Sequence, residues 1–146
     1  MDAYPFDRFT ADAKRVLVYA QQEAEDAGLS YVGTEHLLLG LFRLASGSGY
    51  RALQSLGVDQ MKVRADLQSM QEAPGHVPPR PTKALQRAIV HAFEESRRHG
   101  TDVVRTAHLL AGLALVSDAV AADLLKRQWA QPDQVLAAVE RELGPS

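Results

Sequence analysis

The chain has no cysteine, which excludes disulfide bonds, thiolate catalysis and cysteine-ligated metals. Aromatic residues make up only 6% of its 146 positions, and its formal net charge is −2. An acidic balance gives no long-range attraction to nucleic acid or to an anionic membrane. Arg97, Arg98 and His99 form the densest basic run, which we interpret as the solvated face of a helix. We therefore expect no nucleic-acid partner.

The sequence also lacks any apolar run near the roughly 20 residues that a membrane helix needs. Its first residues, Met1 to Pro5, carry no signal-peptide pattern. Hydrophobic residues nevertheless account for 46% of the chain, enough for one domain with a sizeable core. We predict a cytoplasmic, monomeric protein with no membrane contact.

A repeated segment organises the chain. Residues 33–41 read Gly-Thr-Glu-His-Leu-Leu-Leu-Gly-Leu, and residues 105–113, which lie 72 positions later, read Arg-Thr-Ala-His-Leu-Leu-Ala-Gly-Leu. The same offset also pairs Gly28 with Gly100, without insertion or deletion. A fixed period of this kind marks a duplicated unit, in which each half buries its apolar face against the other.

Both halves show apolar residues at helical spacing, and no useful stretch alternates with period two. The predicted fold is therefore all-α, with eight helices in two pseudo-symmetric four-helix repeats and no sheet. Thr10, Thr34 and Asp59 are predicted helix caps, whereas Ser46 to Gly49 is predicted to be a loop between helices. The proline-rich segment 72–81 cannot continue a helix. The expected units are a single domain over residues 1–146, repeat one over 6–71, a linker over 72–81 and repeat two over 82–143.

Three segments carry a resemblance to a known family. The lead-in Phe-Asp-Arg-Phe-Thr at residues 6–10, the motif at 33–41, the segment Ala-Leu-Gln-Ser-Leu-Gly-Val at 52–58, and their echoes resemble the Clp N-terminal repeat domain. That domain stands at the front of ring-forming AAA+ unfoldases, and the match is most similar to the ClpC type. The resemblance implies a module that docks client proteins and adaptors for a protein-unfolding and degradation system, without cofactor or chemistry of its own. The chain has no phosphate-binding loop of the G-x-x-x-x-G-K-[ST] type, which agrees with this expectation.

The resemblance implies that Thr34 and Glu35 bind phosphorylated arginine on client proteins. The chemistry supports that role because a helix start offers unpaired amides and a positive dipole end to a phosphate. The Thr34 hydroxyl adds a donor, and Glu35 can accept a charged hydrogen bond from the guanidinium. The structural alternative is that Thr34 only caps its helix and that the dipole alone favours Glu35.

Repeat two departs from this pattern at the same place. Ala107 replaces the glutamate, and Arg105 replaces the glycine before Thr106. This degenerate second site, Arg105 and Thr106, is purely cationic and suits a simple anion or an acidic side chain. Because losing a charged hydrogen bond costs about 1.5–3 kcal/mol, we expect no appreciable phosphoarginine binding there.

His36 and His108 recur symmetrically, but no further ligand stands at metal-binding spacing. We interpret both as buried structural histidines, hydrogen-bonded to a neighbouring loop, and expect no metal. Trp129 occupies the position of Gly57 in repeat two, and an exposed indole there would mark a contact site, whereas a buried one would fill the bundle.

Phe6 and Phe9 precede the first helix, and we predict that both belong to a groove for adaptors or peptides. The resemblance places the aromatic at Phe6 in a groove used by adaptors and cyclic-peptide antibiotics, although Pro81 weakens the other half of that groove. Phe6 fits equally well as a hydrophobic staple on the first helix.

Two hypotheses for function remain. The first is a non-catalytic recognition domain of a Clp-type system that binds phosphoarginine-marked or basic client segments through repeat one. The alternative is a stand-alone adaptor or decoy without ATPase modules, which binds Clp partners or cyclic peptides. An enzyme is not expected, because no nucleophile, base and orienting group can be assembled from these motifs.

Overall fold

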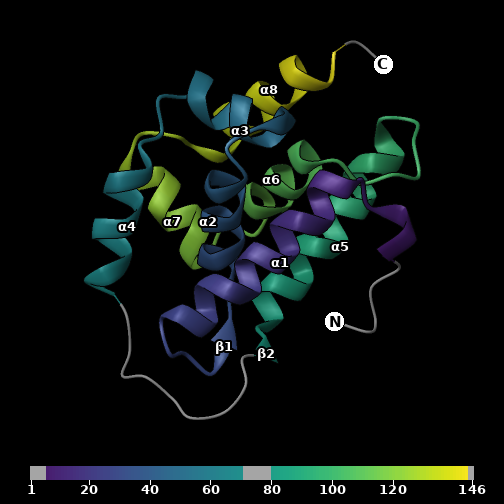
Figure 1. The fold of residues 1–146 in the computed structure, drawn as a ribbon. Coiled ribbons are helices and arrows are strands. Elements are labelled where there is room, and N and C mark those ends of the chain that lie inside the picture. Colours follow the sequence, from purple (N-terminus) through teal and green to yellow (C-terminus); the bar gives the residue numbers. More distant parts are fainter. Residues whose placement is uncertain (1–5, 71–79, 145–146) are drawn as a thin grey trace.

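The computed structural model describes residues 6–70 and 80–144, which form eight α-helices after one short 3-10 helix (Figure 1). This result confirms the predicted all-α fold. The helical elements are η1 Phe6–Arg8, α1 Ala11–Asp26, α2 Thr34–Leu44, α3 Gly47–Ser55, α4 Gln60–Gln68, α5 Lys83–Arg98, α6 Thr106–Leu115, α7 Val120–Arg127 and α8 Pro132–Leu143.

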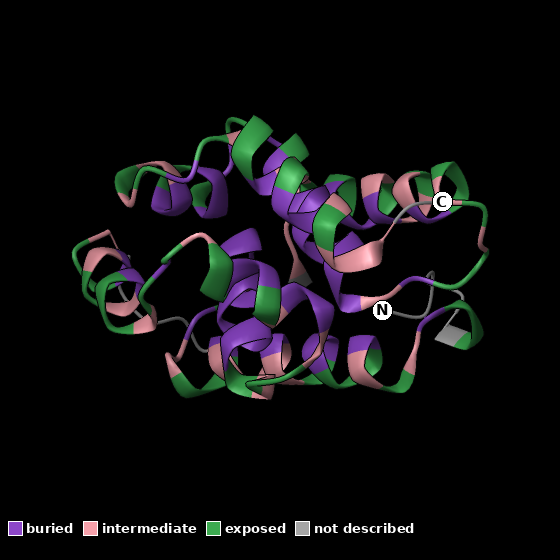
Figure 2. Ribbon diagram, turned by 90° about the horizontal axis from the view of Figure 1, so that it is seen from above, coloured by how far each residue is buried: buried purple, intermediate pink, exposed green. Residues whose placement is uncertain are grey.

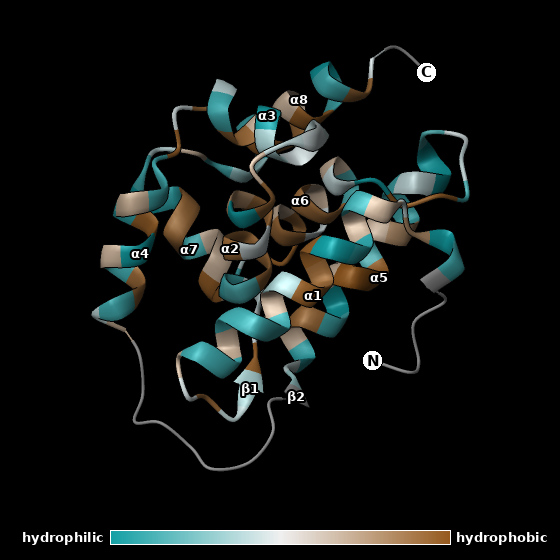
Figure 3. Ribbon diagram, viewed as in Figure 1, coloured by the Kyte–Doolittle hydropathy of each residue, from teal (hydrophilic) through white to brown (hydrophobic). Residues whose placement is uncertain are grey.

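The two motif helices, α2 and α6, form the centre of the molecule. Residues 34–42 of α2 and 106–114 of α6 are all buried. A helix that is buried on every side belongs to the core, and α1 packs along α2 as α5 packs along α6. Figure 2 shows the buried residues gathered in the interior, and Figure 3 shows the hydrophobic residues concentrated on α2 and α6.

The repeats exchange their third helices. Helix α3 of repeat one packs on α6 and α8, and α7 of repeat two packs on α2 and α4 (Figure 1). Each repeat therefore completes the other, because neither can bury its motif helix with its own helices alone. Among the described residues, no single helix is long and apolar enough to cross a membrane, and the one pair that qualifies together, α6 with α7, is bent by 92°.

The prediction that the chain forms no sheet is wrong. Strand β1, Tyr31–Val32, pairs in parallel with β2, Arg80–Pro81, and an isolated bridge joins Phe9 to Val104. The two pairings are related by the 72-residue offset, and both link one repeat to the other. Pairings of one or two residues are too short to produce a period-two pattern in the sequence. Residues 72–79 of the predicted linker lie outside the described part of the chain.

Of the predicted local features, the caps at Thr10 and Asp59 are confirmed, because both side chains accept hydrogen bonds from first-turn amides. The prediction of a loop at residues 46–49 is wrong, because α3 already begins at Gly47 and Ser48 is buried. Polar and glycine residues favour loops by propensity, but here a tertiary contact made by Ser48 overrides that tendency.

Trp129 is 85% exposed and adopts a left-handed backbone with φ of 67°. Its counterpart Gly57 has φ of 72°. This conformation costs a residue with a side chain about 1–2 kcal/mol, whereas glycine adopts it freely and loses only its greater unfolded-state entropy. We expect Trp129→Gly to raise the free energy of unfolding by up to about 1 kcal/mol in urea titrations. Trp129→Ala keeps the strain and should give no gain, and a less stable glycine variant would contradict this account.

Candidate functional site where two helix starts meet

The motif threonines bind the exchanged helices. Thr34 is 2% exposed, and its Oγ1 accepts a hydrogen bond of 3.1 Å from the amide of Ala121 at the start of α7. Thr106 Oγ1 accepts the equivalent bond, 2.9 Å long, from the amide of Gly49 at the start of α3. The residue that caps α2 is Gly33, so the prediction that Thr34 caps its own helix is wrong. Each threonine instead satisfies a first-turn amide of the other repeat.

The motif histidines complete the capping of α2 and α6 by accepting hydrogen bonds from the backbone amides of the N-cap residues. His36 Nδ1 accepts from the Gly33 amide at 2.9 Å, and His108 Nδ1 accepts from the Arg105 amide at 2.9 Å. These bonds confirm the structural role predicted for both rings. Burial lowers the pKa of each imidazole to about 4, so both rings are neutral at pH 7. Within residues 6–70 and 80–144, no group of three or more side chains could hold a metal ion.

Glu35 is a buried carboxylate, with 5% of its surface exposed. It lies over the open face of Gly33, where an added Cβ would stand 2.1 Å from Glu35 Oε1. Burial raises the pKa of the Glu35 carboxyl above 4.5, while a hydrogen bond from its own backbone amide opposes that shift. None of the ion pairs formed within the described residues includes Glu35. A buried charge without a counter-ion is costly, so this carboxylate weakens the fold.

The same place in repeat two is closed by a neutral hydroxyl. Ser48 Oγ accepts from the Ala107 amide at 3.1 Å and lies 3.2 Å from Thr106 Oγ1. At the motif of repeat one, the position equivalent to Ser48 is Val120 of α7, which has no side-chain acceptor, so Glu35 itself accepts from its backbone amide. Sequence reasoning did not identify Ser48 as a residue of this junction. The one signal available is that the 72-residue offset pairs this polar residue with the apolar Val120.

The space over the motif's first residue is filled differently in the two repeats. Repeat one combines Gly33 with Glu35, and repeat two combines Arg105 with Ala107. In each pair one residue is large and charged and the other is small. The contact between Glu35 and the Cβ position of residue 33 accounts for the glycine that accompanies this glutamate in repeat one.

The predicted adaptor groove is described only in part. Phe6 begins η1, and its side chain lies outside the described part of the chain. Phe9 is buried in the core, where its ring meets Phe93 edge-on with 5.2 Å between centroids. Phe9 thus serves the core, and a groove at Phe6 stays a prediction.

Replacing Glu35 with glutamine is expected to stabilise the fold at pH 7. The unfolded chain loses the Glu35 proton near pH 4.5, but the folded chain loses it only at higher pH. Ionisation therefore favours the unfolded state, and the stability present below pH 4.5 is lost as the pH rises through the folded pKa. We expect Glu35→Gln to gain about 1–3 kcal/mol at pH 7, the desolvation range for a buried polar group, because the amide carries no charge and its oxygen can still accept from the backbone amide of residue 35.

The check is urea unfolding of the Glu35→Gln variant and the parent chain at pH 7 and pH 5.5. The gain should shrink at the lower pH, because the folded carboxyl takes up its proton as the pH falls through its raised pKa. Glu25→Gln, at an exposed position of α1, is the matched control and should stay within about 0.5 kcal/mol. A loss of stability at pH 7 in Glu35→Gln would show that the charge is paired.

These features define a class of protein. It is an all-α domain of two interlocked repeats. Each motif helix begins with a threonine that accepts a hydrogen bond from the other repeat, followed by a histidine that accepts one from the N-cap amide of its own helix. The chain belongs to the family described as Clp repeat (R) N-terminal domain, which matches residues 8–79 and again residues 80–146.

Relatives of known name support this assignment. The chain is 38% identical over 145 residues to the Bacillus subtilis protein named negative regulator of genetic competence ClpC/MecB, covering 95% of this chain and 17% of that protein. It is 33% identical over 144 residues to the rice chloroplastic chaperone protein ClpC1, covering 97% of this chain and 16% of that protein. The chain thus spans about a sixth of the length of these relatives.

A solved structure shows the same fold. The N-terminal domain of the caseinolytic protease associated chaperone ClpD from Arabidopsis thaliana superposes with a TM-score of 0.77 at 28% identity, covering 98% of this chain and 99% of that one. The fold and the family expected from the motifs are confirmed.

Proposed function

We propose that this domain recognises client proteins for a Clp-type unfoldase by binding phosphorylated arginine at the start of α2. The observation that carries the proposal is the Glu35 carboxylate, which is buried and forms no ion pair within the described residues. A protein that keeps such a charge loses stability, which is typical of residues retained for binding. The similarity to ClpC of Bacillus subtilis supports the class of function but not the ligand.

The guanidinium of phosphoarginine is the natural partner of Glu35. A carboxylate accepts charge-assisted hydrogen bonds from a guanidinium, and these bonds are stronger than neutral ones. Glu35 itself takes up the Cβ position of Gly33, so residue 33 does not compete with the carboxylate for this space. Binding would supply the counter-ion that Glu35 lacks.

The phosphate would meet two helix starts. The bond from the Ala121 amide to Thr34 Oγ1 holds the starts of α2 and α7 together, so two positive dipole ends converge beside Glu35. The Thr34 hydroxyl accepts this bond and keeps its own hydrogen for donation. Phosphoarginine, with an anionic phosphate at its tip and a guanidinium behind it, matches this arrangement.

Repeat two is unsuited to the same ligand. It has no carboxylate at the junction, and the Ser48 hydroxyl already takes the Ala107 amide. Arg105 adds positive charge where the guanidinium would lie. We propose a single phosphoarginine site per chain, in repeat one.

Calorimetric titration with free phosphoarginine tests the proposal, with phosphate and arginine as separate controls. One site per chain is expected, and Glu35→Gln should weaken binding about 10- to 150-fold, because a charged hydrogen bond contributes about 1.5–3 kcal/mol. Glu25→Gln should bind as the parent chain does. Equal binding of phosphate alone would contradict a role for the guanidinium, and no binding of phosphoarginine would contradict the proposal.

A further inference from the structure

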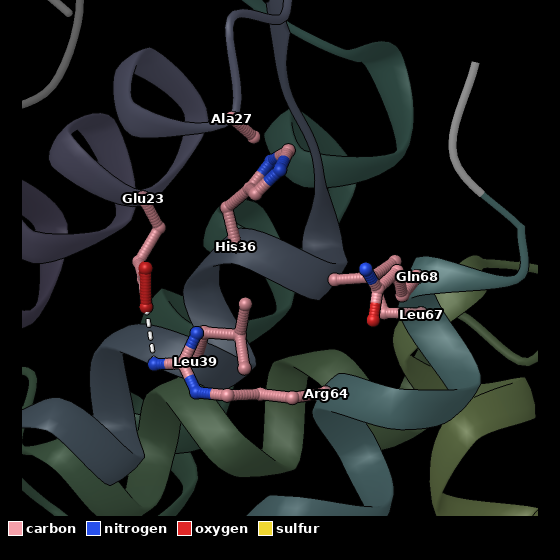
Figure 4. A pocket seen from close by; sticks show the side chains of 7 residues that line it. All are labelled: Glu23, Ala27, His36, Leu39, Arg64, Leu67 and Gln68. Atoms are coloured by element: carbon pink, nitrogen blue, oxygen red, sulfur yellow. Dashed lines mark hydrogen bonds and ion pairs between the residues drawn. The ribbon is translucent and has the colours of Figure 1, made fainter.

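A separate pocket opens beside the motif histidine of repeat one. It has a volume of about 220 Å³ and lies between α1, α2 and α4. Figure 4 shows His36 and the ion pair between Glu23 and Arg64 at this pocket, with 2.5 Å between their charged atoms. The lining residues are Glu23, Ala27, His36, Leu39, Arg64, Leu67 and Gln68. Nε2 of His36, like Nε2 of His108 in repeat two, is buried and has no hydrogen-bond partner among the described residues.

The chain itself shows what fills the equivalent space in repeat two. The 72-residue offset pairs Ala27 with His99, whose side chain is only 7% exposed. The prediction that His99 lies on a solvated face is therefore wrong. Its ring lies against His108, with 5.5 Å between centroids. Repeat two thus carries an imidazole where repeat one has a pocket.

The ring of His99 is held at both nitrogens. Nδ1 lies 2.8 Å from the backbone oxygen of Glu95, and Nε2 lies 2.9 Å from Glu140 Oε1. At the equivalent positions repeat one has the backbone oxygen of Glu23 and, in place of the Glu140 carboxylate, the neutral side-chain amide of Gln68, which can donate as well as accept.

We propose that the pocket beside His36 binds the imidazole ring of a histidine side chain presented by a bound peptide. The ring would lie against His36 as His99 lies against His108. Its N–H would donate to the backbone oxygen of Glu23 and its other ring nitrogen would accept from the side-chain amide of Gln68, while its edges would pack on Leu39 and Leu67. This site is distinct from Glu35, so it contributes to recognition independently of the phosphoarginine site.

The test is a titration of the 15N-labelled chain at pH 7.5 with imidazole and with N-acetyl-histidine methylamide, followed by NMR. Saturable shifts are expected at the amides of Ala27, Leu39 and Leu67. N-acetyl-alanine methylamide, which lacks the ring, should cause none. The absence of saturable shifts with either ring compound would overturn the proposal.

Two variants test the comparison between the repeats, one by filling the pocket of repeat one and the other by opening the equivalent space in repeat two. Ala27→His should fill the pocket from within and weaken imidazole binding at least tenfold. The backbone permits it, because Ala27 has φ of −80° and ψ of −6°, close to −88° and 10° at His99. His99→Ala should open the second pocket, gain shifts at Ala111 and Val139, and recover thermal stability when imidazole is added.

Each outcome decides the proposal. Undiminished binding by a folded Ala27→His variant would overturn it, and if that variant does not fold, the His99→Ala titration decides instead. The connector contains His76, so the titration is repeated on His76→Ala. Tighter binding of imidazole by that variant would show that the chain supplies its own ring, and would overturn a site for a partner's histidine. Unchanged binding supports the proposal.

Discussion

Lowering the pH from 7 to about 4.5 is expected to remove most of the stability of this domain, because its two motif histidines must stay neutral. His36 and His108 each accept a hydrogen bond at Nδ1 from the amide that precedes their helix. A protonated ring cannot accept that bond. Both rings are almost fully buried, so protonation would also place a charge in the core.

The direction in which stability changes with pH follows from the pKa values of the two histidines. The unfolded chain binds these protons near pH 6.5, but burial lowers the folded pKa of both rings to about 4. For His36 the charge of Glu23 opposes the shift in pKa, and for His108 the neighbouring His99 and Arg105 add to it. The stability is therefore complete above pH 6.5 and is lost as the pH falls towards 4. The loss is about 3 kcal/mol per histidine over that range.

The measurement is the free energy of unfolding in urea at pH 7.5, 6.0 and 5.0. Below pH 6 the two histidines should together contribute a slope approaching two protons taken up on unfolding, which the raised pKa of folded Glu35 partly offsets, and His36→Gln or His108→Gln should each remove about half of the histidine contribution. Glutamine is a suitable replacement because Gln134 already caps α8 in this way, accepting from the Gln131 amide at 2.9 Å. A stability that does not change between pH 7.5 and 5.0 would contradict the account.

A comparably large loss is expected from Gly112→Ala. An added Cβ at Gly112 would stand 2.2 Å from the backbone oxygen of Ala88, where α6 crosses α5. Gly40 has the same role in repeat one, with a Cβ position 2.6 Å from the Val16 oxygen. Backbone atoms cannot move aside as a flexible side chain can, so the helices must separate. We expect a destabilisation of about 3 kcal/mol or more.

Gly100→Ala is the matched control for this substitution. Gly100 has φ of 77° but no atom within 4 Å of its Cβ position, so alanine there incurs only the backbone strain of about 1–2 kcal/mol. Urea unfolding of both variants separates close packing from strain. A Gly112→Ala variant as stable as Gly100→Ala would show that the helix crossing is looser than described.

The sequence allowed the helices to be predicted because their signals are local. Apolar spacing and caps such as Thr10 and Asp59 act within one turn of the helix that they mark. The exchange of α3 and α7 could not be predicted, since periodicity shows that a face is buried but not which helix covers it. Ser48 was assigned to a loop for this reason, because its partner Thr106 is distant in the sequence.

The sequence predicted the helix start that carries Thr34 and Glu35, but it did not predict the contacts that these residues make. Thr34 and Glu35 do lie at a helix start, where their position in the motif puts them. Neither the burial of Glu35 nor the bond from Ala121 to Thr34 leaves a pattern in the sequence, because both depend on the other repeat. In the basic run, Arg97 and Arg98 are exposed as predicted, but His99 is not, since adjacent residues of one helix point in different directions.

The central claim is that repeat one, and not repeat two, binds phosphoarginine. The most direct measurement is a titration of the 15N-labelled chain with free phosphoarginine, in which the two motifs report separately. The amides of Thr34 and Glu35 should shift to saturation, while those of Thr106 and Ala107 should not. Equal shifts in both motifs, or a response of Thr34 that persists in Glu35→Gln at the same ligand concentration, would contradict the account.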